Sequence, residues 1–183
     1  RKGIAVTVSH RGLEVGANEF VASNPEFHMS TLGRWVAVSG AAVSPGAGSY
    51  TSRGLAALSF LLGSRLGFWM RNPQPIIKTS NRNLSKFCNW GWHLLPKPLM
   101  LASEASATFY GKARPWWYLS DGGHFENTGV YALLKRQVDF IILSDASSDL
   151  HYKFSDIENL VRKARIDFGA EIDFYTREEA ESL

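Results

Sequence analysis

The stretch that decides the fold is residues 118–129, which read YLSDGGHFENTG. An aromatic, strand-like approach over residues 116–119 runs into Asp121, and a segment with helical spacing follows the two glycines. A strand that breaks at Asp-Gly-Gly and restarts as a helix puts the carboxylate at the carboxyl end of the strand, where open α/β sheets place their chemistry. Gly122 and Gly123 permit positive φ and leave room for a ligand or a second backbone.

A structural turn is the competing interpretation of these residues. Asp-Gly is a common turn dipeptide, and an Asp side chain also caps the starts of helices. Short motifs of this kind arise often by chance, so the wider sequence has to decide between the two interpretations.

Three blocks of the sequence together resemble patatin-like phospholipases. The first block is residues 35–45, WVAVSGAAVSP, and the second is Asp121-Gly122-Gly123 with Asn127. The third is the apolar run 138–145, VDFIILSD, which is typical of a strand buried on both faces of a parallel sheet. The blocks stand in the order that they have in that family, and large bacterial patatin-like proteins are the nearest likeness.

The resemblance implies an α/β fold of three layers, with a mainly parallel sheet and helices on both faces. Residues 1–183 would form the carboxyl-terminal part of such a catalytic domain. The implied activity is lipid acyl hydrolysis of the phospholipase A or esterase type, by a Ser–Asp dyad without cofactor or metal. Asp121 would be the activating carboxylate, and Gly122, Gly123 and Asn127 would support the loop or the substrate.

The resemblance also implies partners and a location. The substrate would be a lipid or phospholipid, and the protein would be cytoplasmic or peripheral to a membrane, with contact to the membrane surface. A net charge of +3 and scattered basic residues give no arm for binding nucleic acid. The single cysteine excludes an internal disulfide and a Cys-rich zinc site.

The nucleophile of the family, the Ser of a G-x-S-x-G elbow, has no counterpart in this chain. Ser39, Ser44 and Ser49 come nearest to the pattern, and none has glycine at both second-neighbour positions. No Gly-rich loop followed by a helix precedes residue 30 to supply an oxyanion hole. We therefore expect the nucleophile in an amino-terminal part of the same protein that packs on this chain. The 183-residue chain alone is expected to show no esterase activity.

Other roles compete for the same residues. Asp145 also follows a predicted strand, although the corresponding strand of the family is structural. His124 lies between Asp121 and Glu126, a spacing that allows a metal site only if the turn brings the three together. Asn127 either caps the next helix or holds the loop.

Two other functional classes stay open. A non-catalytic patatin-like module for binding or assembly would keep the fold without the activity. A Rossmann-like nucleotide binder is disfavoured, because no G-x-G-x-x-G follows any predicted strand.

The rest of the chain gives coarser expectations. We expect strands over 4–9, 138–144 and 172–175, with a short extended piece near 20–22. Expected helices include residues 32–39, capped at 30 or 31 and broken by Gly40, then 53–69, capped by Ser52, and 98–110. A further helix, with capping-box residues 155 and 158, is expected to stop at Gly169. The Trp-rich stretch 71–117 suits either core packing or a lipid-facing surface, and the last residues, 176–183, are expected to fray.

Overall fold

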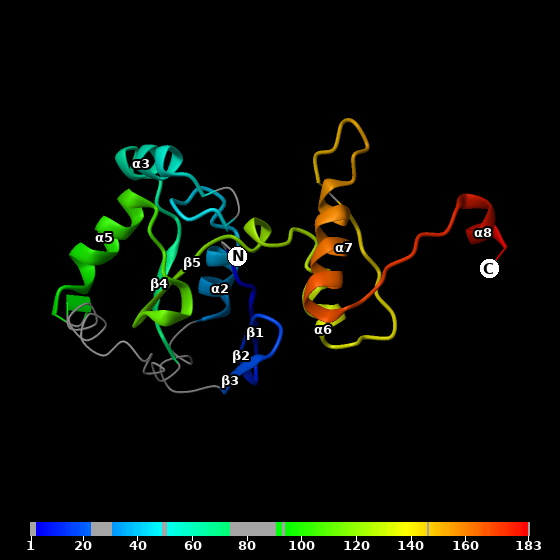
Figure 1. Ribbon diagram of the computed structural model, residues 1–183, viewed down its shortest axis with the longest axis horizontal. Helices are drawn as coiled ribbons and strands as arrows, with labels where there is room; N and C mark the ends of the chain where they lie inside the picture. Colours follow the sequence, from blue (N-terminus) through cyan, green and yellow to red (C-terminus); the bar gives the residue numbers. More distant parts are fainter. Residues whose placement is uncertain are drawn as a thin grey trace. The chain divides into compact units, whose positions relative to one another are not determined.

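The computed structural model describes residues 3–22, 31–48, 51–73, 91–92, 94–145 and 147–182 (Figure 1). The chain divides into two compact units, Arg1–Phe125 and Glu126–Leu183. Within the described ranges, the elements are a mixture of helices and small antiparallel sheets. No helix in these ranges is long and apolar enough to cross a bilayer.

The first unit opens with an antiparallel meander of β1 (Val6–Ser9), β2 (Gly12–Val15) and β3 (Glu19–Ala22). The central strand alternates: the side chains of Leu13 and Val15 are fully buried, while Glu14 between them is only half-buried. Alternation with period two is the pattern of a strand with one face on a core. The strand expected over 4–9 and the extended piece near 20–22 are confirmed.

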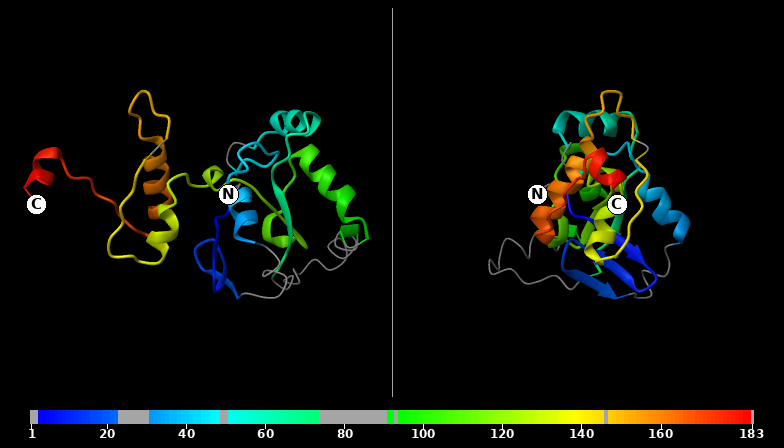
Figure 2. Two further views of the ribbon diagram at one scale, coloured as in Figure 1. Left: turned by 180° about the vertical axis from the view of Figure 1, so that it is seen from behind. Right: turned by 90° about the vertical axis from the view of Figure 1, so that its right-hand side faces the viewer.

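Several helices follow in the described part of this unit, and local signals set the starts of three of them. The Thr31 side chain accepts from the Arg34 backbone N–H at the start of α2 (Leu32–Ser39), and Gly40 ends that helix. Ser52 likewise caps α3 (Arg53–Leu61). The third helix, α5 (Pro96–Ser106), has proline in its first turn and packs against α3, as Figures 1 and 2 show from opposite sides.

The helix expected over 53–69 is shorter than predicted. It ends at Leu61, and the chain then turns at Gly63, which has a φ of +72°. Residues 68–71 instead form β4 (Phe68–Arg71), which pairs antiparallel with β5 (Trp116–Leu119). The apolar residues of 53–69 could line a helix, but pairing with a distant aromatic strand overrides that local preference.

Tyr118 of β5 is enclosed between two glycines and a cluster of rings. A Cβ at Gly46 would lie 2.7 Å from the Tyr118 ring, and a Cβ at Gly67 would lie 2.1 Å from its hydroxyl oxygen. The ring stacks on Phe109 at 4.6 Å between centroids and meets Trp69 edge-on at 5.1 Å. In the Trp-rich stretch 71–117, Trp92 and Trp117 are buried, which fits core packing, one of the two roles expected for that stretch, while residues 74–90 and 93 lie outside the described residues.

The second unit consists of α6 (Val130–Lys135), α7 (Ser155–Phe168) and α8 (Arg177–Glu181) with their connections. Tyr131 joins the first two helices, because its ring lies 4.8 Å from that of Phe168 and its hydroxyl donates to Asp167 at 2.8 Å. Gly169 ends α7 in the left-handed region, as predicted.

Other expectations for this unit's helices were wrong. The capping box predicted for α7 does not form, because Phe154 rather than Ser155 is the N-cap and no side chain caps it. The tail does not simply fray, since Thr176 and Glu179 form a reciprocal capping box at the start of α8.

The two strands predicted in this unit, 138–144 and 172–175, do not form. Phe140 and Ile142 are 76% and 84% exposed, instead of buried on both faces. An apolar run becomes a strand only where neighbouring strands satisfy its backbone, and no described segment of the second unit pairs with it. The mainly parallel sheet predicted from these runs is likewise not found in the described residues, where every ladder is antiparallel.

Candidate functional site

Asp121 lies just past the end of β5, as the sequence predicts, at the start of a single 3-10 turn, η3 (Gly122–His124). Its Oδ1 accepts a hydrogen bond from the Gly123 backbone N–H at 2.8 Å. The residue is neither buried nor fully exposed, and within the described residues Oδ2 makes no hydrogen bond. One carboxylate oxygen therefore holds the turn, and the other can receive a proton.

His124 ties this turn to the loop that follows α2. Its Nε2 lies 3.2 Å from the carbonyl oxygen of Ala42, and its Nδ1 lies 3.3 Å from the Ser120 hydroxyl. If Nε2–H donates to that carbonyl, Nδ1 is the acceptor, so the Ser120 hydroxyl donates to it. The carbonyl oxygen of His124 also approaches Gly48, where an added Cβ would be only 2.5 Å away. The small residues of this loop thus permit a close approach of the two backbones.

A serine of the first resemblance block lies beside the Asp-Gly-Gly turn. Gly122 has no side chain, and a Cβ built there would be 3.3 Å from the Ser39 hydroxyl oxygen at the end of α2. Ser39 is exposed, and it belongs to the block that precedes Asp121 in the resemblance. The first and second blocks, more than 70 residues apart in sequence, therefore meet in the first unit.

Asn127 does not cap the next helix, because the N-cap of α6 is Gly129, with a φ of +74°. Its side chain instead donates to the Asp156 carboxylate at 2.9 Å. Asn127 therefore lies in the second unit and links the segment before α6 to the first turn of α7.

Glu126, rather than Asn127, caps the backbone N–H groups at the start of α6. Its buried carboxylate accepts from the backbone N–H groups of Thr128, at 2.5 Å, and Tyr131, at 3.3 Å. The sequence signal was an acidic residue just before a helical run, which favours the unpaired N–H groups at a helix start. With these bonds in place, Glu126 serves the backbone of α6.

A buried carboxylate elsewhere in the first unit was also missed. Glu104 of α5 is 2% exposed and accepts from Arg65 Nε at 2.5 Å and from Trp69 Nε1 at 2.7 Å. The hydrogen bond from Arg65 to Glu104 raises the pKa of the guanidinium, so Arg65 stays protonated. Nothing in the local sequence distinguishes Glu104 from a solvated helical glutamate, because its partners lie 35 and 39 residues away.

Asp145, the rival carboxylate, is exposed and bonded within its own loop. Its Oδ1 accepts from the Ser147 backbone N–H at 2.9 Å, and bonds from the Ser147 side chain and backbone lower the pKa of the carboxyl. No group of three or more His, Cys, Asp or Glu side chains in the described ranges could hold a metal ion.

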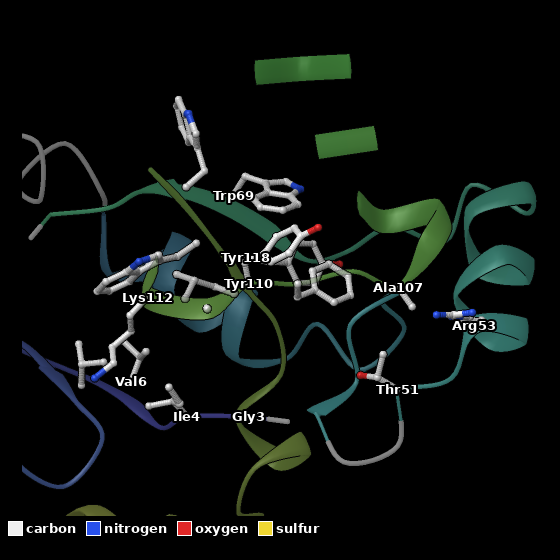
Figure 3. Close-up of a pocket in the computed structure, with 16 residues that line it drawn as sticks. Gly3, Ile4, Val6, Thr51, Arg53, Trp69, Ala107, Tyr110, Lys112 and Tyr118 are labelled. Atoms are coloured by element: carbon white, nitrogen blue, oxygen red, sulfur yellow. The ribbon is translucent and has the colours of Figure 1, made fainter. Parts of the chain in front are cut away.

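A pocket of about 660 Å³ lies in the first unit, and Asp121 is not among the residues that line it (Figure 3). Aromatic and aliphatic side chains from β1, β2, β4 and β5 form most of its wall, together with the chain from Ala107 to Lys112. In the close-up, Trp69 and Tyr118 lie at the centre of the wall, with Arg53 towards one end and Lys112 towards the other. The sequence could not locate this pocket, because its wall combines segments from residue 3 to residue 119.

The chain matches no protein-family model, no curated protein and no solved structure.

Proposed function

We propose that this chain carries the activating carboxylate, Asp121, of a serine-dependent hydrolase that cleaves lipid esters, in the manner of patatin-like phospholipases. The nucleophilic serine and the oxyanion hole would come from polypeptide outside the chain. The three-layer, mainly parallel patatin-like fold belongs to the same proposal and would require that further polypeptide.

The observation that carries the proposal is the state of the Asp121 carboxylate. It stands at the end of β5 on a turn secured through Oδ1, while Oδ2 has no hydrogen bond in the described residues. A general base needs a fixed position and one oxygen able to take a proton. Gly122 has no side chain, and the Ser39 hydroxyl approaches the turn closely at that position.

The proposed step needs no histidine between the two groups. Oδ2 of Asp121 takes the proton of the serine hydroxyl while the serine oxygen bonds to the ester carbonyl carbon. As the tetrahedral intermediate collapses, the carboxylic acid returns the proton to the leaving alcohol, and an acyl-serine ester remains. Water, deprotonated by the same carboxylate, then attacks the acyl-serine ester, and the carboxylic acid returns that proton to the serine oxygen as the fatty acid leaves.

The test is Asp121→Asn in the full-length protein, assayed with p-nitrophenyl butyrate. The amide cannot take the proton, so kcat should fall at least about a hundredfold, the usual contribution of a positioned base. Asp145→Asn, which changes an exposed carboxylate on a loop, is the matched control and should keep wild-type activity. Equal activity of wild type and Asp121→Asn would remove Asp121 from the mechanism.

A non-catalytic module is the second candidate, and the Asp121 hydrogen bond to Gly123 favours it. That bond alone gives the carboxylate a structural role at a turn. In that case Asp121→Asn would leave both stability and any ester turnover nearly unchanged, since an Asn oxygen can accept the same backbone bond. Absence of a G-x-S-x-G segment from the full reading frame would support this candidate over the hydrolase.

A further inference from the structure

We propose that the 660 Å³ pocket of the first unit binds an amphipathic monoanion, a molecule with an apolar body and one carboxylate that Arg53 holds. The site does not include Asp121, so binding there is independent of the proposed hydrolase. The volume lies within the range of roughly 300–1,000 Å³ that is typical of pockets for small organic ligands.

The wall of the pocket suits an apolar body. Its lining includes Trp69, Phe109 and Trp117, together with aliphatic side chains of β1 and β2. Such surfaces gain free energy when a hydrocarbon or a ring system displaces water from them. Trp69, Phe109 and Tyr118 are also packed against one another, so this part of the wall is already formed without a ligand.

Two polar atoms of the wall lack partners. Trp117 is 4% exposed, and neither its Nε1 nor the buried hydroxyl of Tyr118 has a hydrogen-bond partner among the described residues. The Tyr118 hydroxyl is near Ser44 and Gly46 without meeting hydrogen-bond geometry to either. Buried N–H and O–H groups normally find acceptors. Both atoms are covered by protein, so a ligand in the pocket does not reach them, and the preference for a class of ligand rests on the charged side chains instead.

The charged side chains that line the pocket favour an anionic ligand. The described lining residues include two cations, Arg53 and Lys112, and no carboxylate. Lys112 is paired with Glu19 of β3, whereas Arg53 makes no ion pair within the described residues. Figure 3 places Arg53 beside Thr51 and Ala107, at the end of the pocket away from Lys112. One uncompensated guanidinium at one end of an apolar pocket matches one carboxylate at one end of an apolar molecule.

The experiment measures binding to the 183-residue chain by calorimetry and by quenching of tryptophan fluorescence. The probes are laurate, with a flexible chain, 2-naphthoate, with fused rings, and dodecanol, which has the laurate chain without the charge. At least one carboxylate should bind more tightly than dodecanol. Arg53→Gln should weaken that carboxylate about tenfold or more, since it removes a charge-assisted hydrogen bond, and should leave dodecanol unchanged. Arg11→Gln, at an exposed turn of the same unit, is the matched control and should have no effect.

A second pair of variants tests the pocket itself. Val6→Phe narrows the wall at β1 and should weaken every probe, whereas Thr7→Phe on the opposite face of the same strand should not. Circular dichroism verifies that each variant folds. The proposal is overturned if neither carboxylate binds, if Arg53→Gln leaves carboxylate affinity unchanged, or if Val6→Phe and Thr7→Phe behave alike. If laurate binds more tightly than 2-naphthoate, the apolar body of the ligand is a flexible chain. If 2-naphthoate binds more tightly, the body is a ring system.

Discussion

Tyr118 owes its position to the absence of two side chains, at Gly46 and Gly67. Because an added Cβ at Gly67 would lie 2.1 Å from the phenol oxygen, Gly67→Ala should lower the free energy of unfolding by about 1–3 kcal/mol through overpacking. Gly54→Ala in α3 is the matched control, since nothing lies within 4 Å of its Cβ. That change should raise stability by up to about 1 kcal/mol. Urea unfolding of both variants measures the contrast, and a neutral Gly67→Ala would show that the ring can move aside.

The same residue gives the protein a pH dependence at the alkaline end. Burial raises the pKa of Tyr118 to about 12, whereas an unfolded tyrosine titrates near 10. Between these values the unfolded chain has lost the proton and the folded chain keeps it, so stability falls as pH rises. Below pH 10 the contribution is constant.

Tyr118→Phe should therefore make the stability of the protein less sensitive to pH between about 10 and 12. Urea unfolding at pH 8, 10 and 11 would show a smaller slope than in wild type. The exposed residue Tyr175 supplies the control, because Tyr175→Phe removes one phenol from a position without burial. Identical slopes for wild type and Tyr118→Phe would contradict the assignment.

At the scale of elements, the Arg65–Glu104 pair joins α5 to the segment between α3 and β4. Arg65→Met should destabilise the protein by about 3 kcal/mol, because it leaves a buried carboxylate with only the Trp69 N–H. Adding Glu104→Gln to that variant should recover part of the loss, since the charge is then gone. Arg162→Met on the exposed side of α7 should change stability by less than about 0.5 kcal/mol. Chemical denaturation of Arg65→Met, Glu104→Gln, the double variant and Arg162→Met tests the coupling, and strictly additive effects of the two single changes would refute it.

Elements whose determinants are local were predictable from the sequence. Thr31 and Ser52 cap their helices with bonds that span three residues, and Gly169 ends α7 through its own backbone conformation. The strand predicted over 138–144 does not form, because a strand depends on pairing partners that the hydrophobic pattern of its own residues does not reveal. The candidate site divides in the same way. The position of Asp121 after a strand was predictable, whereas the contact from His124 to Ala42, across 82 residues, was not.

At the scale of the whole molecule, exposed apolar side chains predict association. Phe140 and Ile142 are among several large hydrophobic residues of the second unit that face solvent, and such surfaces mark interaction sites or aggregation risks. We expect the 183-residue chain to self-associate in sedimentation velocity. Replacing both residues by Lys should shift it towards the monomer, whereas Ser144→Lys with Ser148→Lys, which adds the same charge at exposed polar positions, should not. A monomer at all concentrations would contradict the expectation.

The antiparallel pairing of β4 with β5 fixes the position of the Asp121 carboxylate, because Asp121 follows the last residue of β5 by only two positions. Phe68 faces Leu119 and Met70 faces Trp117, so a slip of one residue would carry Asp121 about 3.3 Å along the strand and turn Trp117 outward. A deletion of one residue within β5 would therefore misplace Asp121, while α5, whose Glu104 binds Arg65 and Trp69, limits changes in the connection between the two strands.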